Sequence, residues 1–133
     1  MEKVLLFSDD DKLFKITNRI TEGKYDLIKC TFHQLEMNKY PLADVVIMHF
    51  DREKMGKGTF EPIVRIKGKL GHSVPILAII ESEGAQGIFS VLKAGVYDYI
   101  ETTDNLQMYA KKIEGLILWN WYLKKYESGE KRQ

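Results

Sequence analysis

His49 is the residue whose type and position are most informative about chemistry. It ends the run Asp44-Val45-Val46-Ile47-Met48-His49, whose consecutive apolar residues are typical of a strand buried on both faces. Parallel sheets bind ligands at the carboxyl ends of such strands. There, an imidazole can bind a metal together with Asp9 and Asp51, can accept a phosphoryl group, or can simply hydrogen-bond to a neighbouring acid. We interpret His49 as a hydrogen-bonded structural residue and keep the other two roles as alternatives.

Acidic residues follow the first apolar run of the chain, residues 4–7, which also predicts a buried strand. The next positions are Ser8, Asp9 and Asp10. Carboxylate oxygens are the ligands that Mg²⁺ and Ca²⁺ prefer, so Asp9, Asp10 and Asp51 are candidates for weak metal binding. Acids in such loops more commonly cap helices or remain solvated. We therefore expect no tightly bound cofactor.

The composition excludes several classes of protein. The chain has 133 residues, 44% of them hydrophobic and 29% charged, and its formal net charge is +1. This length supports one domain with a substantial core, and this charge gives no reason to expect binding to nucleic acid or to a membrane surface. No apolar run has the length of a membrane-spanning helix. The single cysteine, Cys30, cannot form an internal disulfide, and we expect it to pack in a protein of the reducing cytoplasm.

Strand and helix patterns alternate along the whole chain. Apolar runs predict strands at residues 4–7, 25–30, 44–49, 74–80 and 97–100. Apolar residues three and four apart predict helices that start near residue 11, at Thr59, before Ile88, and at Thr103 or Asp104, with one or two turns at 31–38. Residues 51–58 and 81–84 are predicted to be loops. A strand–helix unit repeated five times makes a three-layer αβα sandwich around a parallel sheet.

Two segments of the second half resemble the end of the response-regulator receiver domain, the CheY-like family. They are Val74-Pro75-Ile76-Leu77-Ala78-Ile79-Ile80 and Leu92-Lys93-Ala94-Gly95-Val96-Tyr97-Asp98-Tyr99-Ile100. In that family a proline-led strand precedes a helix that ends in a similar alanine–glycine pattern. The resemblance covers about residues 3–120, and it implies a flavodoxin-like fold with the strand order 2-1-3-4-5.

The resemblance also implies a phosphoryl-transfer site, and this chain departs from it at nearly every position. Receivers carry a phosphoryl-accepting aspartate after the third strand, two acids that hold Mg²⁺, a hydroxyl after the fourth strand and a lysine after the fifth. The matching residues here are His49 for the acceptor, Ser8 and Asp9 for the acids, Ile80 for the hydroxyl and Thr102 for the lysine. Asp9 alone is of the expected type. We interpret the chain as a degenerate receiver, or pseudo-receiver.

The predicted function is therefore signalling in a two-component-type phosphorelay system by protein–protein contact, without aspartyl phosphorylation and without catalysis. The alternative is a receiver that accepts a phosphoryl group on an atypical residue, Asp51 or His49. A flavodoxin-like binder of a small ligand is a third possibility, which the lack of a glycine-rich loop after the first strand disfavours.

The last two helices and the fifth strand are the expected interaction surface. Aromatic and aliphatic side chains suit such a role, and the candidates are Ile88, Val91, Tyr97, Tyr99, Trp119 and Tyr122. Trp121 lies on the apolar stripe of the last helix and is predicted to be in the core. The expected partner is a protein, a fused output domain or a second copy of the chain. We expect the domain to span residues 1–126, with an extended last helix, and residues 127–133 to form a polar tail or linker.

Overall fold

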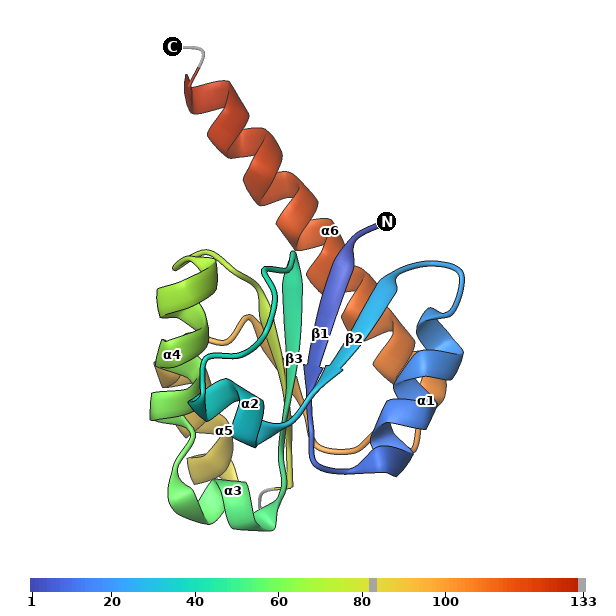
Figure 1. The fold of residues 1–133 in the computed structure, drawn as a ribbon, viewed down its shortest axis with the longest axis vertical. Helices are drawn as coiled ribbons and strands as arrows, with labels where there is room; N and C mark the ends of the chain where they lie inside the picture. The colour runs from blue at the N-terminus through green and yellow to red at the C-terminus, as the bar shows by residue number, and fades with distance from the viewer. Residues whose placement is uncertain (82–83, 132–133) are drawn as a thin grey trace.

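A five-stranded parallel sheet lies at the centre of the computed structural model, which describes residues 1–81 and 84–131 (Figure 1). Its strands are β1 (Lys3–Phe7), β2 (Asp26–Cys30), β3 (Val45–Phe50), β4 (Ile76–Ile80) and β5 (Asp98–Ile100). Their order is β2-β1-β3-β4-β5, and every neighbouring pair is parallel. The predicted sandwich and strand order are confirmed.

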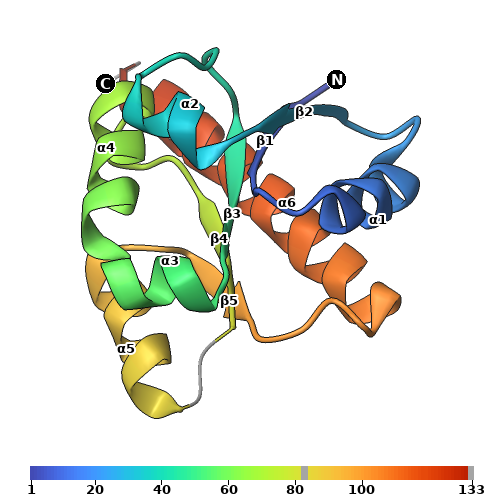
Figure 2. The same ribbon diagram turned by 60° about the horizontal axis from the view of Figure 1, so that its bottom comes forward.

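Helices cover both faces of the sheet, as Figure 2 shows. Helices α1 (Asp11–Thr21) and α6 (Leu106–Lys131) lie on one face. The other face is covered by α2 (Phe32–Glu36), α3 (Arg52–Lys57), α4 (Phe60–Leu70) and α5 (Ala85–Ala94). Among the residues that the structure describes, no helix is both long enough and apolar enough to cross a bilayer.

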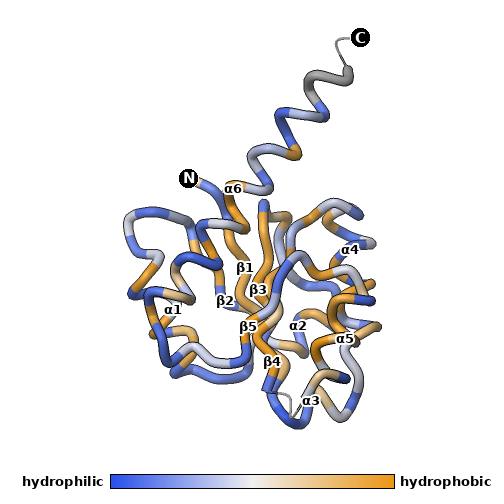
Figure 3. The backbone as a smooth tube through the Cα atoms, turned by 180° about the vertical axis from the view of Figure 1, so that it is seen from behind, coloured by the Kyte–Doolittle hydropathy of each residue, from blue (hydrophilic) through white to orange (hydrophobic). Residues whose placement is uncertain are grey.

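The central strands are apolar because both of their faces are buried. Side chains alternate along β3, so that Val45 and Ile47 join the core under α1 and α6, whereas Val46, Met48 and Phe50 join the core under α2, α4 and α5. Burial of each such side chain stabilises the fold by roughly 1.5–3 kcal/mol. Figure 3 shows the resulting concentration of hydrophobic residues in the strands.

One local prediction is wrong, and the start of the next helix is as predicted. Residues 52–57, predicted to be loop, form the short helix α3, because the Asp51 carboxylate accepts a hydrogen bond from the backbone N–H of Lys54 (2.8 Å) and Gly58, with φ +102°, ends the helix. The predicted helix start at Thr59 is confirmed, because Thr59 is the N-cap residue of α4, but its hydroxyl makes no capping bond and lies 2.9 Å from that of Ser90.

The start of α6 and its buried face also differ from the prediction. Asn105, and neither Thr103 nor Asp104, accepts a hydrogen bond from the first turn, at the N–H of Met108 (3.1 Å). The buried face carries Tyr109, Ile113, Leu116 and Asn120. Trp121 lies one residue, or about 100°, further round the helix. It is therefore 51% exposed and outside the core, contrary to the prediction.

Helix α6 continues through Lys131 and projects beyond the sheet, as Figure 1 shows. The segment predicted to be a polar tail, residues 127–133, is thus helical as far as Lys131, and residues 132 and 133 lie outside the described residues. Residues 82 and 83 of the predicted loop 81–84 also lie outside them.

Candidate functional site

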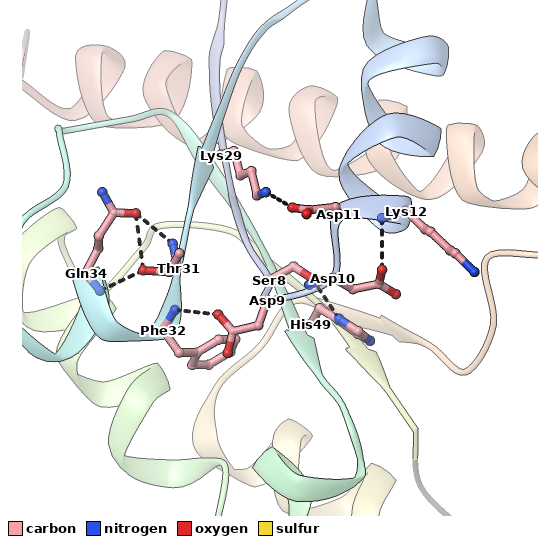
Figure 4. Close-up of polar contacts among 10 residues, drawn as sticks. All are labelled: Ser8, Asp9, Asp10, Asp11, Lys12, Lys29, Thr31, Phe32, Gln34 and His49. Atoms are coloured by element: carbon pink, nitrogen blue, oxygen red, sulfur yellow. Dashed lines mark hydrogen bonds and ion pairs between the residues drawn. The ribbon is translucent and has the colours of Figure 1, made fainter.

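Three side chains meet at the carboxyl ends of β1, β3 and β4. Ser8 follows β1, His49 is the penultimate residue of β3, and Glu81 follows β4. The Ser8 Oγ lies 2.9 Å from Nδ1 of His49, and Nε2 of His49 lies 3.1 Å from Oε1 of Glu81 (Figure 4 shows Ser8 and His49). Parallel strands bring these residues together although they are distant in the sequence.

The surrounding hydrogen bonds assign a tautomer to His49. The backbone N–H of Asp10 donates to Ser8 Oγ at 3.0 Å, so the hydroxyl hydrogen of Ser8 is free to donate to Nδ1 of His49. The proton of a neutral imidazole then lies on Nε2 and is donated to Glu81. Ser8 is completely buried and His49 is 5% exposed, and in this arrangement every polar atom of the two side chains has a partner.

Asp9 pairs with a lysine that the sequence did not single out. Its Oδ2 lies 2.9 Å from Nζ of Lys54, on α3, and its Oδ1 accepts the backbone N–H of Phe32 at 3.3 Å. Burial tends to raise the pKa of Asp9, but the hydrogen bonds from Lys54 and Phe32 and the charge of Lys54 outweigh that effect and hold the pKa below its ordinary value. The Lys54 ammonium thus neutralises the one acid position that the receiver pattern retains.

The other candidate acids support helix ends. Asp10 accepts the N–H of Lys12 at 2.9 Å and caps α1, while Asp51 caps α3. Asp9, Asp10 and Asp51 are therefore each engaged by a protein donor. In residues 1–81 and 84–131 there is no group of three or more His, Cys, Asp or Glu placed to hold a metal ion.

Ile80 and Thr102 bring neither a hydroxyl nor a cation to the site. Ile80 is completely buried and belongs to the core under α4 and α5. Thr102 is exposed, and its hydroxyl accepts the backbone N–H of Asp104 at 3.1 Å. Neither residue therefore supplies the hydroxyl or the cation that the receiver pattern places at these positions.

The candidate interaction surface is only partly assembled as predicted. Val91 is completely buried and cannot contact a partner, which corrects that assignment, whereas Ile88 and Tyr99 are half-buried against the core. Tyr97 and Trp119 are exposed and stacked, with ring centroids 5.4 Å apart.

Further exposed side chains extend this surface. Tyr122 lies one turn beyond Trp119 on α6, and the α5 side chains Phe89 and Leu92 are exposed as well. The predicted interaction surface did not include Phe89 or Leu92. Phe89 and Leu92 are thus the exposed large apolar side chains of α5, whereas Val91 is buried.

Solved receiver domains are among the structures that resemble this chain. A scan of protein-family models and a search of curated proteins find no match to the chain. Among solved structures, a signal receiver domain of two-component signal transduction (histidine kinase) from Clostridium thermocellum is 18% identical, with a TM-score of 0.75 over 87% of this chain and 97% of that one. A response regulator from Thermotoga maritima is 15% identical, with a TM-score of 0.71 over 88% and 98%.

A third similar structure carries a different name. It is described as the adenylate cyclase from Rhodopirellula baltica, and it is 16% identical, with a TM-score of 0.77 over 99% of this chain and 98% of that one. At such identities the likeness establishes the fold, which is the flavodoxin-like fold of receiver domains.

Proposed function

We propose that this chain is a pseudo-receiver, a signalling domain of a two-component-type system that acts through protein–protein contact without aspartyl phosphorylation. The observation that carries the proposal is the occupant of the acceptor position. There the imidazole of His49 is held between Ser8 and Glu81 and is nearly inaccessible to solvent. A buried, fully hydrogen-bonded imidazole is a poor replacement for an accessible carboxylate nucleophile.

The remainder of the site supports the same proposal. Phosphoryl transfer requires cations that neutralise charge on the transferring group. In this site the nearby ammonium of Lys54 is already paired with Asp9, and Ile80 supplies no group that can bond a phosphoryl oxygen. The site is thus stabilised by internal contacts, as expected of a domain that does not depend on phosphorylation for its active shape.

The atypical acceptors are less favoured by their surroundings. Asp51 uses Oδ1 to cap α3, and both ring nitrogens of His49 have partners. The likeness to a chain named as an adenylate cyclase concerns the fold, and the described residues offer no acidic cluster that would hold a catalytic metal. We therefore propose a non-enzymatic role.

The surface proposed for partner recognition comprises Phe89 and Leu92 on α5, Tyr97 before β5, and Trp119 on α6. These side chains are 42–65% exposed, and Tyr97 stacks on Trp119 of α6. Aromatic residues are enriched among the anchors of protein interfaces. A protein partner or a fused output domain is the proposed occupant.

Incubation with acetyl phosphate and Mg²⁺, followed by intact mass spectrometry, tests the proposal. The expected result is an unchanged mass, together with an unchanged amide NMR spectrum on addition of beryllofluoride and Mg²⁺. The matched control restores the family pattern by the substitutions Ser8→Asp, His49→Asp, Ile80→Thr and Thr102→Lys, and we expect it to gain one phosphoryl group.

Phosphorylation of the unmodified chain would refute the proposal. Two variants would then identify the atypical acceptor, because His49→Gln and Asp51→Asn each remove one candidate while retaining a polar side chain. Loss of the added mass in one variant alone would identify the residue that carries the phosphoryl group.

A further inference from the structure

The outer face of α6 carries a regular series of residues that the core does not use. Helix α6 has 26 residues and is therefore about 39 Å long. Opposite its buried face, alternate spacings of three and four residues connect Met108, Lys111, Gly115, Leu118, Tyr122 and Lys125. Such a series forms a single stripe along a helix, which is the arrangement that pairs helices in coiled coils.

Large apolar side chains of this stripe are exposed. Leu118 is 53% exposed and Tyr122 is 52% exposed. Met108, near the start of the helix, is exposed as well. Trp121 and Tyr126 flank the stripe and are exposed as well. A helix that projects from a domain with this much apolar surface is stabilised when a second element covers it.

Gly115 gives the stripe a gap beside these large side chains. A Cβ added at Gly115 would meet no atom within 4 Å, so the glycine is not required by packing within the chain. Glycine in the interior of a helix is unfavourable relative to alanine. A hollow of about 430 Å³ adjoins it, lined in part by Tyr97, Met108 and Lys111. The gap at Gly115 and the protruding side chains of Leu118 and Tyr122 thus lie next to each other on α6.

We propose that two copies of this chain associate through these stripes, with the two α6 helices antiparallel about a twofold axis. In the register that sets Leu118 opposite Tyr122 of the second copy, Lys125 lies opposite Gly115. The missing side chain of Gly115 then leaves room for the aliphatic stem of Lys125. A twofold axis repeats each contact, as in other isologous interfaces.

Charge complementarity favours this antiparallel pairing. Glu114, which is exposed beside Gly115, comes next to Lys125 of the second copy, so that the lysine ammonium has a carboxylate partner. Within one chain the ammonium of Lys125 lies 4.8 Å from the centroid of the Trp121 ring, on the same side of the helix. In a parallel pair, each residue of the stripe would instead face the same residue of the second copy. Lys111 would then face Lys111, Lys125 would face Lys125, and Gly115 would face Gly115.

This inference goes beyond the proposed function, because it concerns the outer face of α6 and does not depend on phosphoryl chemistry. Sedimentation velocity from low to high micromolar concentration tests it on the full chain. The expected result is a reversible rise from the mass of one chain to that of two. Leu118→Glu and Gly115→Leu should each raise the dissociation constant about tenfold or more, since one buries a charge and the other fills the gap.

Phe60→Glu is the matched control. Phe60 is an exposed α4 residue, and its replacement should leave the dissociation constant unchanged. Because Leu118, Gly115 and Phe60 make few contacts within the chain, circular dichroism should show that all three variants fold. A mass of one chain at every concentration, or a dimer that neither stripe variant weakens, would overturn the proposal.

Exchange of charges tests the register itself. Glu114→Lys and Lys125→Glu should each weaken the dimer, and the double variant should recover most of the affinity, because the two side chains face each other only in the antiparallel arrangement. Failure of the double variant to recover would overturn the antiparallel register, whatever the result of the phosphorylation experiment.

Discussion

The ammonium of Lys54 lies 2.9 Å from the carboxylate of Asp9, so that a helix of the protein supplies a cation next to the one acid retained from the receiver pattern. Lys54 is only 15% exposed, and its aliphatic stem brings Nζ to 5.2 Å from the centre of the Phe32 ring. This lysine belongs to α3, a helix that exists because Asp51 caps it. The Asp51 carboxylate therefore caps the same helix that brings the Lys54 ammonium to Asp9.

Lys54→Met should destabilise the fold by up to about 1 kcal/mol around neutral pH, because Asp9 is partly exposed and solvent weakens the pair. The pKa of Asp9 is depressed in the folded state. Its contribution is therefore present above the pKa of the unfolded chain, about 3.9, and is lost as the pH falls through the folded value. Urea unfolding of the wild type and the variant should give curves that converge in acid.

Lys57→Met is the control for this comparison. Lys57 forms an exposed ion pair with Glu53 in the same helix, and its loss should change the unfolding free energy by no more than a few tenths of a kcal/mol. If Lys54→Met and Lys57→Met had the same effect at every pH, the pairing of Lys54 with Asp9 would not stabilise the protein.

The Ser8–His49 contact should appear as a coupling in a double-mutant cycle. Ser8→Ala leaves Nδ1 of the buried imidazole without a donor, and His49→Phe leaves the buried serine hydroxyl without its acceptor. Each change should cost about 1–3 kcal/mol. The double variant should be more stable than the sum of the single changes predicts, by about 1 kcal/mol.

Urea unfolding of the four proteins measures this coupling, with Glu81→Gln as the control. Glu81 is about half exposed and an amide can still accept from Nε2, so this variant should lose little stability. Strict additivity of Ser8→Ala and His49→Phe would contradict the assigned hydrogen bond.

The sheet is predictable from sequence because burial on both faces imposes a simple pattern. Residues 45–48 and 76–80 are uninterrupted apolar runs, which are typical of central parallel strands. The partners of His49 and Asp9 were not predictable in the same way. Glu81 and Lys54 are ordinary charged residues in the sequence, and only the packing of β3 beside β4 and the direction of α3 bring them to the site.

The buried face of α6 illustrates a different limit. Leu106, Ala110, Ile113, Ile117 and Trp121 are a plausible apolar stripe, yet the core side of the helix carries Tyr109, Leu116 and Asn120. Both stripes include Ile113 and differ by a rotation of the helix. On the core side, the Thr17 hydroxyl of α1 lies 2.7 Å from that of Tyr109, a contact between residues 92 positions apart that the helical spacing alone does not reveal.

Asp51→Ala should destabilise the protein by about 1 kcal/mol, whereas Asp51→Asn should cost much less, because asparagine also caps helices. The cause is the hydrogen bond from the N–H of Lys54 to Oδ1 of Asp51. Hydrogen exchange of the Lys54 amide, measured by NMR, should accelerate in the alanine variant. Equal destabilisation by alanine and asparagine would mean that the negative charge of Asp51, and not the cap, is what the fold requires.

Tyr109→Phe should destabilise the protein by about 1 kcal/mol at neutral pH, because the Tyr109 hydroxyl donates to Thr17 Oγ1 (2.7 Å), whose own hydrogen is donated to the carbonyl of Leu13. Burial raises the pKa of Tyr109, and the bond to Thr17 offsets only part of that effect. Its neutral form therefore contributes stability that is present below pH about 10, the value for an unfolded chain, and is lost as the pH rises toward the folded value. Urea unfolding in alkali should show a steeper loss of stability for the wild type than for Tyr109→Phe, so that the two curves converge. Tyr126→Phe, at an exposed position, should retain the wild-type slope, and a slope that Tyr109→Phe leaves unchanged would mean that Tyr109 does not govern the alkaline transition.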